Sequence, residues 1–405
     1  MWADLVHSFV NLLVSVVVAR RIIKLGPVIV SGLLRSTLGL GQGARSFVVA
    51  FRDMGVDVRV SDLGDKFHRS DTVEVDLGRP PRVAEGGVLI VHLNPPELPM
   101  GLFHLGRKQL KHKNIIGYWT WELPTLPKSW NRGFNYVDEV WVPTNFVAAA
   151  IQPHTKLPVR VIPYPLRQES PSALDRAAFG IPDDAFVCLT LCDVRSSAAR
   201  KNPVGAIRAF RKALGNNARA LLVVKISNSN DAPEVMAEIK REIGTTANIK
   251  LMLNTLSVED QAALIQCSDT VISLHRAEGF GLVLAEAMLR GKAVIATGWS
   301  GNMDFMNMEN SMLIGYQLAP IVDPQGIYDH TLGHWAEPNL DEAVTKLQAL
   351  AEDEELRRKI GASAKRTMSD YFSVERFREA ISKSLALSER ADGSSQIGLL
   401  AAQRE

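Results

Sequence analysis

The chain has 405 residues, of which 46% are hydrophobic and 22% are charged, and these proportions exclude a disordered or fibrous protein. At roughly 150 residues per domain, the length predicts two domains, with room for a third. The net charge of +2 argues against a nucleic-acid partner, yet residues 1–167 hold 20 Lys+Arg and 13 Asp+Glu, whereas residues 168–405 hold 26 and 31, so a basic part precedes a mildly acidic one.

The first predicted element is an apolar helix at residues 5–19, which Arg20, Arg21 and Lys24 follow. The helix is shorter than the ~20 residues that cross a bilayer, and its cations follow rather than precede it, which disfavours a signal peptide. Residues 1–26 therefore have two interpretations. They form a helix packed on the protein body, or an interfacial helix that holds the protein at the inner face of the cytoplasmic membrane.

Short apolar runs, each typical of a buried strand, then alternate with helical segments. The strands of this first part are expected at residues 27–32, 56–60, 88–92, 115–119, 139–143 and 159–163. Residues 39–43 are expected to form a glycine-rich turn before a helix. Continuous apolar strands separated by helices are typical of a parallel sheet covered on both faces. Residues 27–167 are therefore predicted to form a doubly wound α/β domain.

A second set of the same kind follows a proline-containing linker at residues 163–182. Its strands are expected at residues 186–192, 220–226, 249–253, 270–274 and 293–297. Its helices are expected at residues 203–214, 232–243, 258–266, 281–289, 340–351, 354–370 and 374–388. We predict a second doubly wound domain over residues 168–390, a loose tail over residues 391–405, and a ligand-binding cleft between the two domains.

The three cysteines are too few and too unevenly spaced for a disulfide framework or a zinc site. Cys188 and Cys192 alternate with leucines in a predicted strand, a pattern typical of buried thiols. We therefore expect a reducing, cytoplasmic setting.

The most informative stretch, HRAEGFGLVLAEAM, begins at His275 after a predicted strand and runs into a helix. Gly279 and Gly281 let the backbone turn tightly, and the new helix presents unpaired N–H groups that suit an anion. Glu278 lies at the carboxyl end of the strand. Glu286 is eight residues further on, in the helix, where a carboxylate suits paired hydroxyls such as a ribose diol.

This order of strand, EGFG turn, helix and second glutamate resembles the E-x7-E signature of glycosyltransferase family 4. The resemblance implies the GT-B fold, with two facing Rossmann-like domains, and retaining transfer of a sugar from a UDP- or GDP-type donor to an acceptor hydroxyl. It implies that Glu278 contacts the sugar and that Glu286 binds the ribose. Further donor contacts are implied for Gly279, Phe280, Gly281 and Leu282.

A basic segment, VRSSAARKNP, follows the strand at residues 186–192, and its cations suit a diphosphate. It resembles the R-x5-K pair with which the family stabilises the departing phosphate, and the matching residues are Arg195 and Lys201. Arg200 is an alternative to Arg195, and a solvated basic loop is the other interpretation. The resemblance implies that Arg195, Lys201 and the helix N-terminus neutralise the leaving diphosphate, so neither a metal nor another cofactor is expected. It also implies that the leaving phosphate oxygen takes the proton of the acceptor, so no dedicated base is expected.

Weaker candidates surround these motifs. Gly39 and Gly41 resemble the glycine-rich loop that faces the donor in the family, and Asn302 lies in a loop expected near the donor. Lys225, at the end of a strand, has two interpretations: its side chain faces the cleft, or it is an ordinary exposed lysine. Glu122 stands where many members have a catalytic His or acid. The acceptor side is assigned to His92, Asn94 and Trp121, with packing as the alternative for His92 and Trp121.

The expected partners are a nucleotide-sugar donor, a glycan or lipid-linked acceptor and an anionic membrane. The basic stretch at residues 104–113 is a solvated face or a surface for such an acceptor. An NAD(P)-dependent oxidoreductase is the rival enzyme, but the GxGxxG fingerprint is missing. A non-catalytic sugar-nucleotide scaffold is expected to lack a glutamate or a cation of the motifs, and all are present. A GT-B epimerase or phosphorylase is the remaining alternative, and without a DxD motif a metal-dependent GT-A enzyme is not expected.

Overall fold

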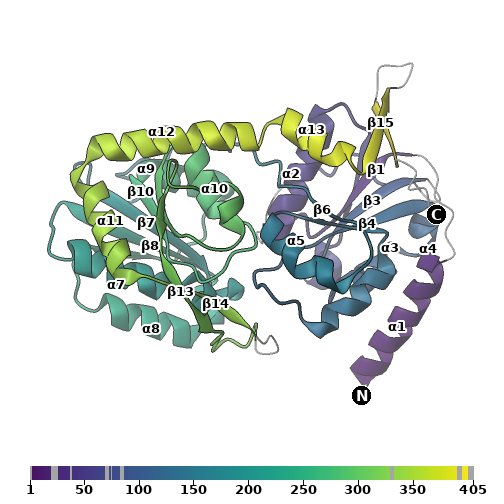
Figure 1. Cartoon of the computed structure of the whole chain (residues 1–405), viewed down its shortest axis with the longest axis horizontal. Coiled ribbons are helices and arrows are strands. Elements are labelled where there is room, and N and C mark those ends of the chain that lie inside the picture. Colours follow the sequence, from purple (N-terminus) through teal and green to yellow (C-terminus); the bar gives the residue numbers. More distant parts are fainter. Residues whose placement is uncertain are drawn as a thin grey trace. The chain divides into compact units, whose positions relative to one another are not determined.

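The computed structural model describes residues 2–19, 26–36, 39–68, 73, 75–82, 86–328, 333–389 and 395–399. The chain divides into two compact units (Figure 1). The first comprises Met1–Trp121, Leu126–Arg167 and Phe372–Glu405, and the second comprises Glu122–Thr125 and Gln168–Tyr371. Each is built on a parallel sheet of six strands.

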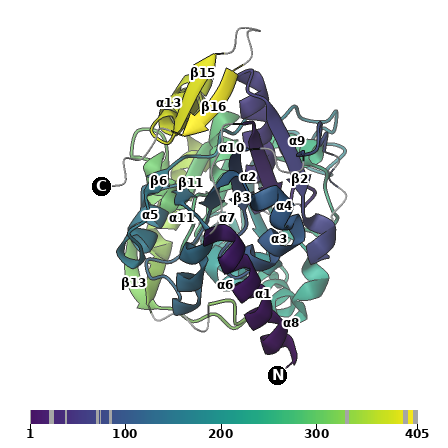
Figure 2. The same cartoon turned by 90° about the vertical axis from the view of Figure 1, so that its right-hand side faces the viewer.

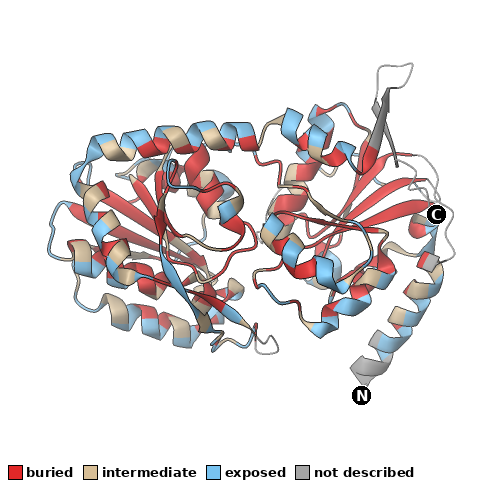
Figure 3. Ribbon diagram, viewed as in Figure 1, coloured by how far each residue is buried: buried red, intermediate tan, exposed pale blue. Residues whose placement is uncertain are grey.

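The first unit has the strand order β2-β1-β3-β4-β5-β6. Its central strands are buried, as the continuous apolar runs predict, because helices cover the sheet (Figure 3). The six expected strands are confirmed as β1 Val28–Gly32, β2 Val58–Asp62, β3 Gly87–His92, β4 Lys113–Tyr118, β5 Glu139–Val142 and β6 Val159–Val161. The α-helices of its N-terminal portion are α1 Trp2–Ala19, α2 Gly39–Asp53, α3 Leu98–Leu105, α4 Arg107–Leu110 and α5 Asn145–Ile151.

The second unit has the strand order β12-β11-β10-β7-β8-β9. Its strands are β7 Phe186–Asp193, β8 Ala220–Ser227, β9 Ile249–Met252, β10 Thr270–Ser273, β11 Ala293–Thr297 and β12 Met312–Ile314. Its helices are α6 Ala198–Lys201, α7 Pro203–Leu214, α8 Pro233–Ile243, α9 Val258–Cys267, α10 Leu282–Leu289, α11 Leu340–Glu352 and α12 Glu354–Tyr371. The thiols of Cys188 and Cys192 are free and buried in β7, as expected.

The carboxyl end of β7 shows how the chain sets up the helices near the motifs. Asn202 caps α7, and its side chain accepts a hydrogen bond from Gly205 N at 3.0 Å. The same side chain donates from Nδ2 to Leu274 O, just after β10, at 2.8 Å. Pro203 occupies the first turn of α7, where its missing N–H costs nothing. The turn after β7 is thereby tied to the end of the neighbouring strand.

The sequence-based boundary of the second domain is wrong at its C-terminal side. Helix α13 (Val374–Ser382) belongs to the first unit, where the ring of Phe377 lies 5.2 Å from that of Phe47 and 5.6 Å from that of Phe51. An apolar helix face predicts that the helix packs, but not against which sheet.

The predicted helix at residues 374–388 also ends early, because β15 (Leu385–Glu389) follows it. This strand pairs antiparallel with β16 (Ser395–Leu399), in the segment expected to be a loose tail. Figure 2 shows α13, β15 and β16 side by side. Residues 390–394 and 400–405 lie outside the described residues. A second hairpin that the sequence did not indicate joins β13 (Tyr316–Pro320) to β14 (His334–Pro338) in the second unit.

The glycine-rich turn predicted at residues 39–43 is wrong, because these residues form the first turns of α2. A Cβ atom on Gly41 would lie 2.5 Å from Leu33 O and 2.6 Å from Ser36 O. A Cβ on Gly43 would lie 2.0 Å from the ring of Tyr164. The glycines therefore permit close packing of a helix on its surroundings rather than an open loop.

The N-terminal helix α1 packs on the first unit along one face. Val10, Val14 and Val18 are buried at helical spacing, and Asn11 Oδ1 accepts a hydrogen bond of 3.0 Å from Tyr136 Oη. Residues 20–25, which hold the basic cluster of the sequence, lie outside the described residues. In the part of the chain that the structure describes, no helix is both long and apolar enough to cross a bilayer.

Candidate active site

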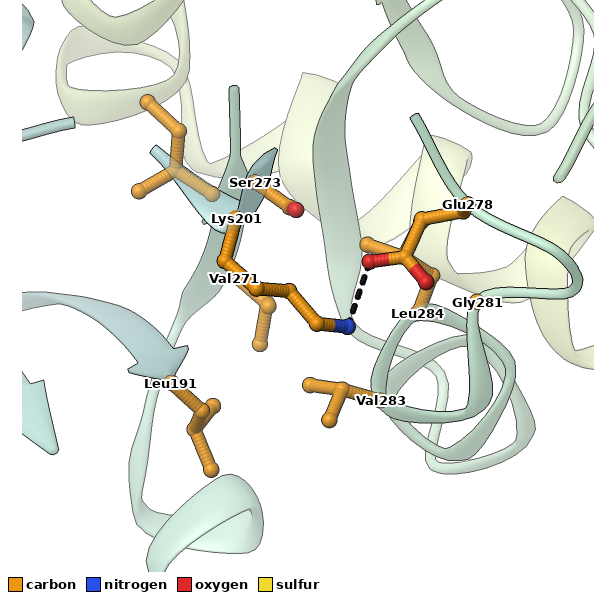
Figure 4. Close-up of a pocket in the computed structure, with 9 residues that line it drawn as sticks. Leu191, Lys201, Val271, Ser273, Glu278, Gly281, Val283 and Leu284 are labelled. Carbon is orange, nitrogen blue, oxygen red and sulfur yellow. Dashed lines mark hydrogen bonds and ion pairs between the residues drawn. The ribbon is translucent and has the colours of Figure 1, made fainter. Parts of the chain in front are cut away.

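Two cations from one segment meet Glu278 in the second unit. Lys201 Nζ, at the end of α6, donates to Glu278 Oε1 at 2.5 Å (Figure 4). Arg200 Nη1 lies 3.3 Å from Glu278 Oε2 and also donates to Ala277 O at 2.7 Å. The Arg200 and Glu278 side chains are 3% and 9% exposed, so this is a buried cluster of charges rather than a surface pair.

Burial alone raises the pKa of the Glu278 carboxyl, but attraction to Lys201 and Arg200 outweighs it and lowers the pKa to about 2. Burial also lowers the pKa of Arg200, whereas Tyr328, Glu278 and Glu122 raise it further than burial lowers it. At neutral pH the site therefore holds an ionised carboxylate beside two cations.

The backbone around Glu278 is held by the loop that follows β11. Glu278 N donates to Ser300 Oγ at 2.8 Å, and Gly301 N donates to Glu278 O at 2.8 Å. Ser300 has a positive φ of 80°, a strained conformation for a residue with a side chain. A Cβ on Gly301 would lie 2.2 Å from Gly279 O, so only glycine allows the two loops to approach this closely.

Asn302 lies in the same loop but is completely buried. Its Nδ2 donates to Thr297 O at 3.1 Å, and its Oδ1 lies 3.1 Å from His275 Nε2. Burial lowers the pKa of His275, which keeps the imidazole neutral. The side chain of Asn302 therefore supports the loop, and a contact with the donor stays a prediction.

The turn into α10 borders a small hollow beside the charge cluster (Figure 4). Gly281 precedes α10 with a φ of 98°, which a side chain would strain. Polar groups of Lys201, Glu278 and Ser273 meet an apolar wall formed in part by Leu191, Val283 and Leu284. A hollow with a few converging polar groups on an apolar wall is typical of a small-molecule site.

Glu286 lies half-buried in α10. Burial lowers the pKa of Arg290, and the charge of Glu286 opposes this shift without reversing it. Phe280 is buried, with its ring 5.2 Å from that of Phe305. Leu282, the first residue of α10, is half-buried.

Arg195 is not brought to Glu278. Its side chain is 46% exposed, and its Nε lies 2.5 Å from Asp231 Oδ2. The segment turns at Ser197, whose positive φ of 62° starts the short helix α6, so that Arg200 points inward in place of Arg195. Of the two arginines that the sequence offers, the structure places Arg200 beside Lys201.

Lys225 is buried at the end of β8, so it is not a surface residue. Its Nζ donates to Ile226 O at 3.2 Å and to Ser227 Oγ at 3.3 Å, and burial lowers its pKa despite the charge of Asp193.

Glu122 groups with the second unit, where its Oε2 accepts a hydrogen bond of 3.1 Å from Tyr328 Oη. Burial and the charge of Glu122 raise the pKa of Tyr328 well above its usual value, although Arg200 opposes the shift.

The acceptor-side candidates pack inside the first unit. His92, at the end of β3, is fully buried, with its ring 4.6 Å from that of Tyr118, and burial lowers its pKa to about 3. Asn94 Oδ1 accepts a hydrogen bond of 3.0 Å from Thr120 N. Trp121 is 8% exposed and packs on Trp130, with ring centroids 4.9 Å apart. These contacts support the packing interpretation for His92 and Trp121.

Three residues that hold the site were missed at the level of sequence: His275, Ser300 and Tyr328. No local pattern marks these contacts, since His275 meets Trp299 O, Ser300 meets Glu278 N and Tyr328 meets Glu122 over 22 or more residues of chain. Within the described ranges, no three His, Cys, Asp or Glu side chains gather so that they could hold a metal ion. Metal independence stays a prediction.

Residues 175–367 match the family model for glycosyl transferases group 1. This match covers most of the second unit, including the Arg200–Glu278–Lys201 cluster and the loop at Ser300. Over these residues the chain is similar to glycosyl transferases group 1. Among curated proteins, none matches the chain.

Solved structures of glycosyltransferases share the fold. Anabaena HepE, in complex with UDP and glucose, is 17% identical with a TM-score of 0.63, over 88% of this chain and 99% of its own. A Rickettsia africae glycosyltransferase is 16% identical with a TM-score of 0.61, over 88% of this chain and 97% of its own. Staphylococcus aureus TarM is 14% identical with a TM-score of 0.53, and the match to 73% of this chain spans only 54% of TarM. The chain has the two-domain Rossmann-like α/β fold of GT-B glycosyltransferases.

Proposed function

We propose that this protein is a retaining glycosyltransferase, related to family 4, that moves a sugar from a UDP- or GDP-sugar to a hydroxyl of a glycan or lipid-linked acceptor in glycan synthesis. One observation carries the proposal. An ionised, buried carboxylate, Glu278, lies beside Lys201 and Arg200 at the turn into α10. This arrangement offers a hydrogen-bond acceptor for sugar hydroxyls and positive charge for a diphosphate within one hollow.

In the proposed reaction, the bond between the sugar C1 and the leaving phosphate oxygen breaks, and a bond from C1 to the acceptor oxygen forms on the same face. The acceptor proton passes to the leaving phosphate oxygen, so no separate base is needed. Lys201, Arg200 and the N–H groups at the start of α10 stabilise the charge that develops on the diphosphate. The Lys201 ammonium has three donors, so it can keep Glu278 while it binds a phosphate oxygen.

Further roles follow from the same proposal. Glu286 binds the ribose hydroxyls, and the backbone of Gly279 and Gly281 contacts the sugar and diphosphate. Glu122 is proposed to lie near the reacting sugar, where its hydrogen bond to Tyr328 fixes its carboxylate. No cofactor is proposed. The UDP in HepE and TarM supports a uridine donor, and the buried free thiols of Cys188 and Cys192 support a cytoplasmic location.

Donor screening tests the proposal. We expect a UDP- or GDP-sugar to raise the unfolding temperature of the whole chain, and NAD(P) to leave it unchanged. Incubation with that donor and glycan or lipid-linked acceptors is expected to give a product whose anomeric configuration, read by NMR, matches that of the donor. Stabilisation by NAD(P) alone, or a product of inverted configuration, would contradict the proposal.

A further inference from the structure

Helix α1 exposes an apolar stripe on the side opposite its packed face. Val10, Val14 and Val18 are buried, whereas five large apolar residues of the same helix are 40–64% exposed. At about 100° per residue, these five fall on one arc of the helix. They are Val6, Phe9, Leu12, Leu13 and Val16. The pale blue surface of α1 in Figure 3 follows much of its length. Scattered apolar residues are ordinary on a surface, but a continuous stripe indicates a partner.

The surroundings of the stripe are basic. α1 contacts α3, α4 and the 3₁₀ segment Lys128–Tyr136. Residues 98–113 and 128–136, which contain these elements, hold no Asp or Glu. Their exposed cations are Arg107, Lys108, Lys111, Lys128 and Arg132. An apolar helical stripe beside elements whose only charged side chains are cationic has the composition of a helix that lies in a membrane interface.

We propose that the exposed stripe of α1 docks the protein on an anionic lipid bilayer. The five apolar side chains enter the boundary between headgroups and acyl chains, while the neighbouring cations contact anionic headgroups. A second copy of the chain fits this surface less well, because a two-fold contact repeats the same patch on both subunits and brings like charges together. This inference does not rest on the proposed reaction, because it uses only residues of the first unit that lie outside the candidate site.

Vesicle flotation with the full chain tests the proposal. The wild type is expected to float with vesicles of phosphatidylcholine mixed with phosphatidylglycerol, and to do so less as salt is added. The double variant Phe9→Ser/Leu12→Ser is expected to bind these vesicles at least tenfold more weakly, because its two most exposed apolar side chains are lost. Val322→Ser is the matched control, since Val322 is 70% exposed in the second unit, and it is expected to float like the wild type.

A second variant separates the charges from the fold of α1. Arg107→Gln/Lys108→Gln leaves α1 unchanged and is expected to weaken binding to anionic vesicles about tenfold, with no effect on vesicles of phosphatidylcholine alone. The proposal is overturned if the wild type does not float, or if both double variants float as well as the wild type. It is also overturned if Phe9→Ser/Leu12→Ser only dissociates a dimer in sedimentation, since the occupant is then a second copy. UDP binding by each variant, measured in solution, reports separately on the candidate active site.

Discussion

Lys201 Nζ lies 2.5 Å from Glu278 Oε1, although 77 residues separate the two in the chain. The group proposed to receive the leaving diphosphate is thus held by the carboxylate proposed to receive the sugar. An ion pair between these groups fixes both side chains before any ligand arrives, which reduces the entropy that binding would otherwise cost.

Glu278→Gln keeps the shape of the side chain and removes its charge. We expect kcat with the cognate donor to fall by about 10²–10³, because hydrogen bonds to a buried charged group contribute strongly to the transition state. Nucleotide binding, measured by calorimetry, is expected to persist because Lys201 and Arg200 remain. Glu309→Gln, at an exposed residue, serves as the control. Unchanged turnover in Glu278→Gln would remove this residue from the reaction.

The two arginines of the basic segment are expected to differ. Arg200→Gln leaves the buried Glu278 with one cation fewer and the carbonyl of Ala277 without its donor, so we expect a loss of about 3 kcal/mol in the free energy of unfolding. Arg195→Gln breaks an exposed pair with Asp231 and is expected to cost less than about 1 kcal/mol. Urea denaturation and donor KM measure both effects. If Arg195→Gln raised the donor KM and lowered the free energy of unfolding more than Arg200→Gln does, Arg195 would be the functional arginine.

Glu278 makes stability depend on pH in acid. Its pKa is lowered from 4.5 to about 2 in the folded chain, so its contribution is complete above pH 4.5 and is lost as the pH falls toward 2. The loss amounts to about 3 kcal/mol. Chemical denaturation across this range is expected to show a steeper decline in the wild type than in Glu278→Gln. Parallel curves would mean that the carboxyl titrates normally.

His92 makes the free energy of unfolding depend on pH over a different and wider range. Burial lowers the pKa of His92 from 6.5 to about 3. Between these two values the imidazole is protonated in the unfolded chain and neutral in the folded chain. Stability therefore falls as the pH decreases from 6.5 toward 3, by about 1.4 kcal/mol for each pH unit over most of that range. His92→Phe is expected to reduce this slope between pH 6 and 4.5. The slope of the unfolding free energy against pH is the measurement, and an unchanged slope would show that His92 is solvated.

Gly301→Ala is expected to displace the loop that binds the backbone of Glu278. The new Cβ would meet Gly279 O at 2.2 Å, whereas the nearest atom to a Cβ on the nearby Gly298 lies at 3.2 Å. We expect about 2 kcal/mol of destabilisation and weaker donor binding for Gly301→Ala, and a much smaller effect for Gly298→Ala. Thermal unfolding with and without UDP compares the two. Equal behaviour would show that the loops can separate freely.

Continuous apolar runs predicted both sheets, since a strand buried on both faces has little choice of composition. The run that forms β7 is an example. Glu278 was also predicted as a candidate, from the glycine turn between a strand and a helix, and Lys201 from the basic segment that follows a strand, because both are local patterns. Which arginine joins them was not, since that depends on the positive φ of Ser197. The packing of α13 on Phe47 was not predicted, because an apolar helix face does not indicate which surface the helix packs against.

Asn202 accepts a hydrogen bond from Gly205 N and donates one to Leu274 O, with its own backbone at a φ of 54°. Few side chains can meet these three demands at once. Aspartate accepts but cannot donate when ionised, serine is too short to reach both partners, and most other residues resist a left-handed backbone. The position is therefore limited to asparagine. Its side-chain amide links the start of α7 to the end of β10 beside Lys201.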